Sequence, residues 1–152
     1  MTVAFRNVSS RPTDPVEDWS TEAVQAALER GDLAEWRLLV GAVDADPWGR
    51  SARQIEEVLG HSRPYGTAEL LERAIEAARA RTGTEERAAV AAELRGLVRR
   101  SGLRQAEFAR RLGTSPSRMS SYVNGAVVPS ATLMVRARNV RRSRRRPSAR
   151  DR

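Results

Sequence analysis

The part of the sequence that most constrains the fold lies at residues 103–140, where short apolar stripes alternate with turn and cap residues. Apolar residues at helical spacing predict a first helix over about residues 105–112. Gly113 permits the left-handed backbone of a tight turn after that helix. Ser115 can cap a second helix, with Pro116 at the first helical position, where its missing N–H has no cost. The sequence therefore predicts two short helices joined by a tight turn.

The second helix has two contrasting faces when its residues are placed at about 100° intervals. The predicted inward residues of the two helices are Phe108, Ala109, Leu112, Met119, Tyr122 and Val123. The residues left outward on the second helix are Ser117, Arg118, Ser120, Ser121 and Asn124. This outward face is short, polar and free of acid, so it can approach base edges without a bulky or repulsive side chain. Gly125 ends the helix, Pro129 prevents its continuation and Ser130 can cap a further helix.

The string RQAEFARRLGTSPSRMSSYVNGAVVPS resembles the Cro/C1-type (Xre-family, lambda repressor-like) helix-turn-helix, over about residues 90–140. The matching residues are Gln105, Ala109, Gly113, Ser115, Ser120, Asn124, Gly125 and Pro129. In that family the second motif helix lies in the major groove of DNA. The resemblance thus implies a helix-turn-helix domain in this part of the chain. Together with the helical pattern of the first half, it predicts an all-α fold in which a small helical bundle is followed by that domain.

The same resemblance implies a role for each exposed residue. Ser117 and Ser121 would face bases with Arg118 beside them, where an arginine can bind guanine through two hydrogen bonds. Gln105 would bind a phosphate at its helix N-terminus, and such contacts would fix the position of the protein. The residues predicted to contact DNA are Arg104, Gln105, Arg110, Arg111, Ser115, Pro116, Ser117, Arg118, Ser120, Ser121 and Asn124.

Within that set, Ser120 and Asn124 would hold the DNA backbone. Pro116 stands where some members of the family have a polar base reader, which removes one contact. The family's usual fifth helix is replaced by RRSRRRPSARDR at residues 141–152. A homodimer is expected. Because the fifth helix that usually makes the dimer contact is replaced, the acidic half of the chain is the alternative source of that contact.

The charge of the chain is divided between its halves. All 27 basic residues are arginine, and the net charge is +8. Residues 1–83 hold ten Arg and fourteen Asp/Glu, a balance of −4, whereas residues 84–152 hold seventeen Arg and five Asp/Glu, a balance of +12. This split indicates an acidic half beside a half that binds a polyanion, most commonly nucleic acid. Seven of the arginines lie in residues 141–152, which suit a disordered tail or an arm on phosphates or in the minor groove.

The acidic half is predicted to be helical. Residues 1–18 contain two prolines and little periodicity, which indicates an extended arm. Residues 19–81 predict about four short helices, which together form an acidic domain for a protein partner or for dimerisation. The predicted cap residues of these helices are Ser20, Asp32, Asp46 (followed by Pro47) and Thr67. Gly83 is predicted to end the last of them, and Thr84 to cap the first helix of a helix-turn-helix domain at residues 84–140.

All three tryptophans lie in the acidic half, where they are expected to form the core of the small helical domain. The alternative is that Trp48 and Tyr65 help to make a partner-binding face. The predicted inward residues of three of the helices are Leu33, Trp36, Val40 and Val43, then Trp48, Ala52, Ile55 and Leu59, then Leu70, Leu71, Ala74, Ile75 and Ala78.

Composition excludes several classes of function. The chain has no cysteine, no lysine and one histidine. It therefore has no cysteine-based metal site, P-loop lysine or Schiff-base lysine, so we expect no enzyme, cofactor or metal. No stretch approaches the roughly 20 apolar residues of a membrane span, and the N-terminus lacks the pattern of a signal peptide, so a cytoplasmic protein is expected.

These patterns together predict a sequence-specific regulator of transcription that binds double-stranded DNA. The alternative is an antitoxin whose residues 19–81 bind a toxin and whose helix-turn-helix regulates its own operon. RNA binding is less favoured, because the two aromatic residues of the basic half, Phe108 and Tyr122, are predicted to be buried and leave no stacking platform.

Overall fold

The computed structural model of the protein describes residues 10–140, which form seven α-helices and one 3-10 helix and no strand. The prediction of an all-α fold is confirmed for these residues. The chain divides into two compact units, Met1–Gly83 and Thr84–Arg152. The arginine-rich segment at 141–152 and the first half of the predicted arm lie outside the described residues.

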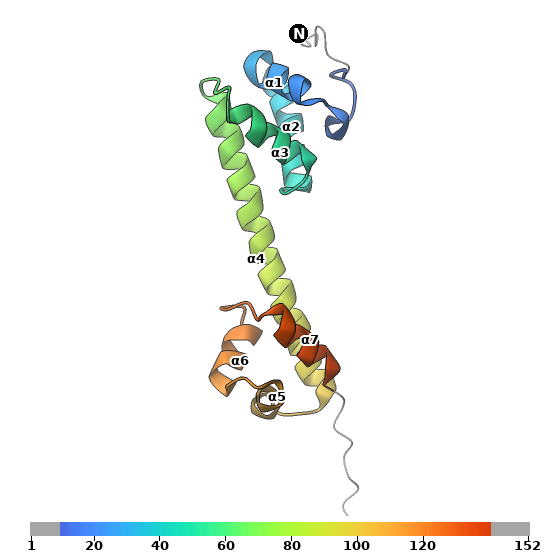
Figure 1. Ribbon diagram of the computed structural model, residues 1–152, viewed down its shortest axis with the longest axis vertical. Helices are drawn as coiled ribbons and strands as arrows, with labels where there is room; N and C mark the ends of the chain where they lie inside the picture. Colours follow the sequence, from blue (N-terminus) through green and yellow to red (C-terminus); the bar gives the residue numbers. More distant parts are fainter. Residues whose placement is uncertain (1–9, 141–152) are drawn as a thin grey trace, which may run out of the picture. The chain divides into compact units, whose positions relative to one another are not determined.

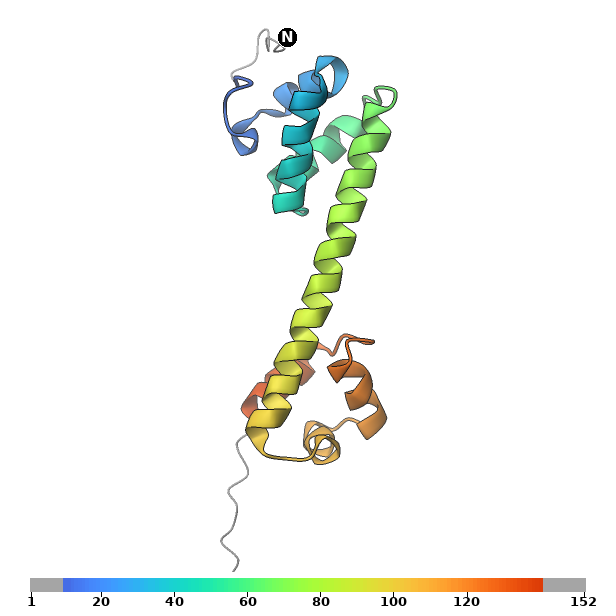
Figure 2. The same cartoon turned by 180° about the vertical axis from the view of Figure 1, so that it is seen from behind.

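The first unit consists of short helices and the beginning of α4 (Figures 1 and 2), and α1 and α2 begin at side-chain caps. Its elements are η1 (Val16–Asp18), α1 (Thr21–Arg30), α2 (Leu33–Ala45), α3 (Arg50–Leu59) and the beginning of α4 (Thr67–Ser101). The Ser20 hydroxyl accepts the Ala23 N–H at 3.3 Å at the start of α1. Asp32 accepts the Ala34 N–H at 2.7 Å, and the Glu35 carboxylate accepts the Asp32 N–H at 3.0 Å. These bonds satisfy N–H groups that a helix start otherwise leaves without a partner.

Trp19 forms the centre of the first unit's core and is fully buried. Its indole N–H donates to the Asp14 carbonyl at 3.0 Å, and its own carbonyl accepts from the Gln54 amide at 3.0 Å. Trp36 is half-buried and donates its indole N–H to the Ala27 carbonyl at 3.0 Å. The core therefore joins η1, α1, α2, α3 and the beginning of α4 through Trp19 and the apolar residues around it.

Two parts of the first unit differ from the prediction. Residues 16–18 of the expected extended arm form η1 instead, because Val16 is buried in the same core as Trp19. The helix expected after Asp46-Pro47 begins later, at Arg50, whose guanidinium donates to the Glu17 carbonyl at 3.0 Å.

As a result Trp48 lies in the turn before α3 and is 61% exposed rather than part of the core. The guanidinium of Arg79 stacks over its ring at 4.2 Å from the centroid. Leu33 and Leu70, both expected inward, are also exposed, since the buried faces of their helices instead centre on Leu39 and Leu71.

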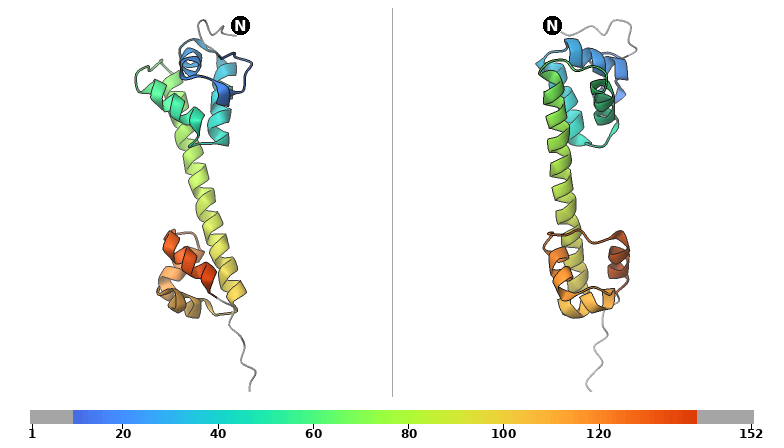
Figure 3. Two further views of the ribbon diagram at one scale, coloured as in Figure 1. Left: turned by 45° about the vertical axis from the view of Figure 1, so that its right-hand side comes forward. Right: turned by 60° about the vertical axis from the view of Figure 1, so that its left-hand side comes forward.

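The second unit packs three short helices against the last turns of α4 (Figure 3). These helices are α5 (Gln105–Leu112), α6 (Pro116–Val123) and α7 (Ala131–Asn139). Its core contains one group of buried residues from all four helices, namely Leu94, Phe108, Ala109, Leu112, Met119, Tyr122, Val123, Met134 and Ala137. Glu93 on α4 binds Arg138 on α7 through two hydrogen bonds of 2.7 and 3.2 Å.

The predicted helix break at Gly83 is wrong, because α4 is assigned without interruption from Thr67 to Ser101. Gly83 does not have a positive φ, and a Cβ placed on it would meet no atom within 4 Å. A glycine inside a helix costs only about 1 kcal/mol relative to alanine. The residues that follow, EERAAVAAEL, have high helix propensity and continue the helix.

Candidate nucleic-acid interface

The turn between α5 and α6 is closed by backbone hydrogen bonds. Gly113 has φ of 74°, the left-handed conformation that favours glycine. The Thr114 N–H donates to the Ala109 carbonyl at 3.0 Å, and the Gly113 N–H donates to the Arg110 carbonyl at 3.1 Å. This pair of bonds is the Schellman motif, which satisfies carbonyls at the end of a helix. It reverses the chain sharply enough for α6 to pack against α5.

The beginning of α6 is fixed as the sequence predicted. The Ser115 hydroxyl accepts the Arg118 N–H at 3.2 Å, and Pro116 occupies the first turn. Met119 is fully buried, and Tyr122 and Val123 are nearly so. Ala109, also fully buried, offers only a methyl group where α5 packs in this core, which permits a close approach of neighbouring helices. The inner face of α6 is therefore held in place by the core.

The structure places the predicted contact residues on the outer surface of the second unit. Nine of them are exposed, namely Arg104, Gln105, Arg110, Arg111, Ser115, Pro116, Ser117, Arg118 and Asn124. Ser120 and Ser121 are half-buried. The Ser121 hydroxyl donates to the Ser117 carbonyl at 3.3 Å, and the Asn124 amide donates to the Ser120 hydroxyl at 3.5 Å. Three small polar side chains and an amide thus line one side of α6.

The charges on this surface are mainly positive. α6 contains no carboxylate, and Arg118 has no ion-pair partner among the described residues. Glu107 on α5 is paired with Arg111 at 3.4 Å, which leaves Arg110 and Arg104 as the uncompensated arginines of that helix and its N-cap. A surface of this kind attracts phosphate groups and has no acid to repel them from α6.

The C-terminal end of α6 is fixed by Gly125, as predicted, and by Arg95, which no sequence pattern pointed to. Gly125 has φ of 74°, and the Ala126 N–H donates to the Ser121 carbonyl at 3.0 Å. Arg95 on α4 donates from its guanidinium to the Val123 carbonyl. Because 28 residues separate Arg95 from Val123, no local sequence signal could have revealed this contact.

An ion pair between Glu93 and Arg138 joins α4 and α7 within the second unit. The hydrogen bond from Arg138 lowers the pKa of Glu93 below its ordinary value. The same carboxylate raises the pKa of Arg138. The pair is exposed, so its contribution to the stability of the unit is small.

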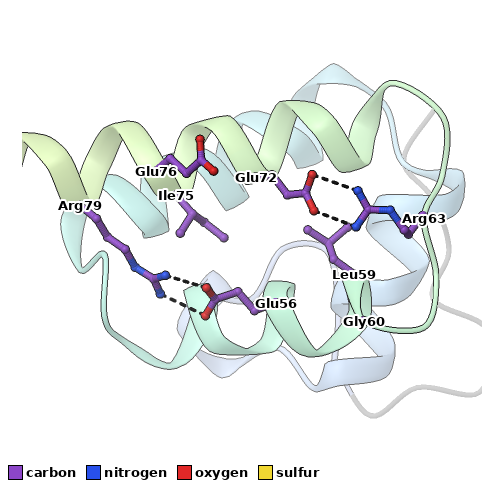
Figure 4. Close-up of a pocket in the computed structure, with 8 residues that line it drawn as sticks. All are labelled: Glu56, Leu59, Gly60, Arg63, Glu72, Ile75, Glu76 and Arg79. Carbon is purple, nitrogen blue, oxygen red and sulfur yellow. Dashed lines mark hydrogen bonds and ion pairs between the residues drawn. The ribbon is translucent and has the colours of Figure 1, made fainter.

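The first unit has a groove of different character. A hollow of about 380 Å³ lies between α3 and the beginning of α4 (Figure 4). Arg79 binds Glu56 at 2.6 Å, and Arg63 binds Glu72 at 2.7 Å, on either side of Ile75. These hydrogen bonds lower the pKa values of Glu56 and Glu72. With both arginines already paired and a further carboxylate, Glu76, in its lining, this groove does not suit a polyanion.

Comparison with known families agrees with the geometry of the second unit. A family model described as a helix-turn-helix domain matches residues 89–140. This part of the chain is therefore a helix-turn-helix domain, a class of fold that binds DNA. Comparisons of the chain with curated proteins and with solved structures gave no match. Among the helices at residues 10–140, none has the combination of length and apolar character needed to cross a membrane.

Proposed function

We propose that the protein is a sequence-specific regulator of transcription that binds double-stranded DNA with α6 in the major groove. The observation that carries this proposal is the two-sided character of α6. Met119 on its inner face is fully buried, whereas Ser117 and Arg118 on its outer face are exposed and no acid lies on the helix. A helix held by the core on one side and polar on the other can enter a groove without reorganisation of the fold.

The roles within the interface follow from side-chain chemistry and from the resemblance to the Cro/C1 type. Arg118 reads guanine, and Ser117 and Ser121 accept or donate hydrogen bonds to either kind of base. Gln105 and Asn124 bind phosphates and fix the position of α6. The protein acts as a homodimer, so its site on DNA has two-fold symmetry.

The test begins with selection of bound sequences from a random duplex pool by the full-length chain. Affinity for the selected site and for a random duplex is then measured for Arg118→Ala. We expect a loss of about 1–3 kcal/mol on the selected site and a relaxed preference at one base pair. Arg136→Ala is the matched control, because Arg136 is an exposed arginine of the same unit that lies on α7.

Arg136→Ala removes the same charge and should weaken both duplexes by similar, small factors. An equal loss on selected and random DNA for Arg118→Ala would contradict base reading by that residue. Sedimentation of the full chain with and without the selected duplex tests the dimer, and a single chain per symmetric site would contradict it.

A second candidate is the antitoxin role, in which the first unit binds a toxin. It is favoured by the exposure of Trp48 at 61% and of Tyr65 at 103%, since large aromatic residues on a surface are typical of interfaces. A small reading frame beside the gene, whose product forms a complex that Trp48→Ala weakens, would support it. Complex formation unaffected by Trp48→Ala and by Tyr65→Ala would count against that surface.

A further inference from the structure

A second hollow lies in the helix-turn-helix unit, beside the C-terminal end of α6, and no function has been assigned to it so far. Its volume is about 350 Å³, within the range of small-ligand sites. The residues that line it are Thr84, Arg87, Ala88, Ala91, Arg95, Asn124 and Gly125. It therefore combines two guanidinium groups with a hydroxyl and an amide, and its lining contains no carboxylate.

Arg95 uses part of its guanidinium to bind the end of α6, and its remaining N–H groups can bind a ligand. One N–H of its guanidinium donates to the Val123 carbonyl. A guanidinium carries five N–H donors in a planar fork that matches phosphate oxygens, and the side chain of Arg95 makes no other hydrogen bond or ion pair within residues 10–140. Arg87, two turns earlier on α4, is exposed in the same wall.

The end of a helix normally repels anions, because its last carbonyls carry partial negative charge. At the end of α6 these carbonyls are all occupied. The carbonyl of Ser120 accepts from Asn124 N–H, that of Ser121 from Ala126 N–H and that of Tyr122 from Gly125 N–H, at 3.0 to 3.2 Å. The fourth, on Val123, accepts from Arg95. The helix end therefore presents few free acceptors to an anion in the hollow.

The carboxylates that lie near the hollow in the sequence are not part of its lining. Glu93 on the same helix is bound to Arg138. Glu85 and Glu86 are exposed and do not line the hollow. The amide of Asn124 has a second N–H beside the one that it gives to Ser120 at 3.5 Å. A lining that contains two guanidinium groups, one amide and no carboxylate suits a small anion with several acceptor oxygens.

We propose that this hollow is a phosphate-binding site that is coupled to DNA binding through Asn124. The phosphate belongs either to a small phosphorylated ligand or to the DNA backbone, and the second source rests on the proposed function. Because Asn124 belongs to both the hollow and the predicted interface, occupation of the hollow changes the state of a DNA-contacting residue.

The test uses two glutamate substitutions on adjacent exposed residues of α4. Ala88→Glu places a carboxylate in the wall of the hollow, whereas Ala89→Glu adds the same charge to the same helix outside it. Neither side chain is buried, so both variants should fold, which circular dichroism of the full chain verifies. Inorganic phosphate and adenosine monophosphate are titrated into each protein, with the Asn124 side-chain amide signal in NMR spectra as readout. Affinities for the selected and random duplexes are measured in parallel.

We expect phosphate or the nucleotide to shift the Asn124 signal in the parent chain and in Ala89→Glu, and Ala88→Glu to weaken that binding by about tenfold or more. Binding of free phosphate or nucleotide in this pattern supports the site whether or not the chain binds DNA. The phosphate site can therefore be correct even if the proposed function is wrong. If no free ligand binds, but Ala88→Glu lowers the affinity for both duplexes and Ala89→Glu does not, the result supports the DNA backbone as the source of the phosphate. Equal behaviour of the two variants in every titration would overturn the proposal.

Discussion

Replacement of Gly83 by alanine distinguishes a continuous α4 from two helices that meet at a glycine. The sequence pattern predicts that Gly83 ends a helix. A glycine at such a position is commonly left-handed, where a Cβ would be strained, so Gly83→Ala would then destabilise the protein. In the structure Gly83 lies inside α4, and its φ is not positive. The two arrangements therefore predict effects of opposite sign for the same substitution.

The expected magnitude follows from the surroundings of the residue. A Cβ on Gly83 would meet no atom within 4 Å, so no packing cost offsets the gain in helix propensity. The gain of alanine over glycine inside a helix is about 0.5–1 kcal/mol, partly because the unfolded chain loses freedom. We therefore expect Gly83→Ala to raise the free energy of unfolding by up to about 1 kcal/mol, or up to roughly fivefold in the folding equilibrium.

Urea unfolding of the full chain, followed by far-ultraviolet circular dichroism, measures this change. Gly113→Ala is the matched control, because a Cβ there also meets no atom within 4 Å but the residue has φ of 74°. That control should lose about 1–2 kcal/mol. A lower urea midpoint for Gly83→Ala than for the parent chain would refute an uninterrupted α4.

Two further predictions concern the helix-turn-helix unit. Phe108→Ala removes a fully buried ring and should lower the free energy of unfolding by about 3–5 kcal/mol. The smaller change Phe108→Leu should lower it far less. Similar urea midpoints for the two variants would contradict the assigned core. Arg138 lowers the pKa of Glu93 in the folded state. The stabilisation by this pair is therefore complete above the pKa of glutamate in the unfolded chain, about 4.3, and it is lost as the pH falls through the lower pKa of Glu93 in the folded state. Glu93→Gln should therefore reduce stability at about pH 7 and have little effect at about pH 3, as measured by urea unfolding, and an equal effect at both pH values would exclude the ion pair as the cause.

Local patterns predicted the helix-turn-helix well because the interactions that create it are local. The Ser115 cap binds a residue three positions later, and the turn at Gly113 is closed by bonds within five residues. The buried stripe of α6 follows from helical periodicity alone, and Met119, Tyr122 and Val123 are all buried as expected. The same reasoning placed the start of α1 at Ser20 and of α2 at Asp32.

Predictions failed where a local signal was weaker than its surroundings. Asp46-Pro47 predicted a helix start, but α3 begins at Arg50, whose guanidinium binds the Glu17 carbonyl. Trp48 therefore lies in a turn on the surface. At Gly83 the turn signal was outweighed by strong helix formers that follow it.

The sequence by itself determined the class of fold, the turn and cap residues and the outward polar face of α6, because each depends on side chains a few positions apart. Only the tertiary structure decided which exposed residues meet across the fold. The contact of Arg95 with Val123 and the hollow that Arg87 shares with Asn124 both join α4 to the end of α6. Such contacts depend on how helices pack, and the packing of distant segments is set by the whole core rather than by any local pattern.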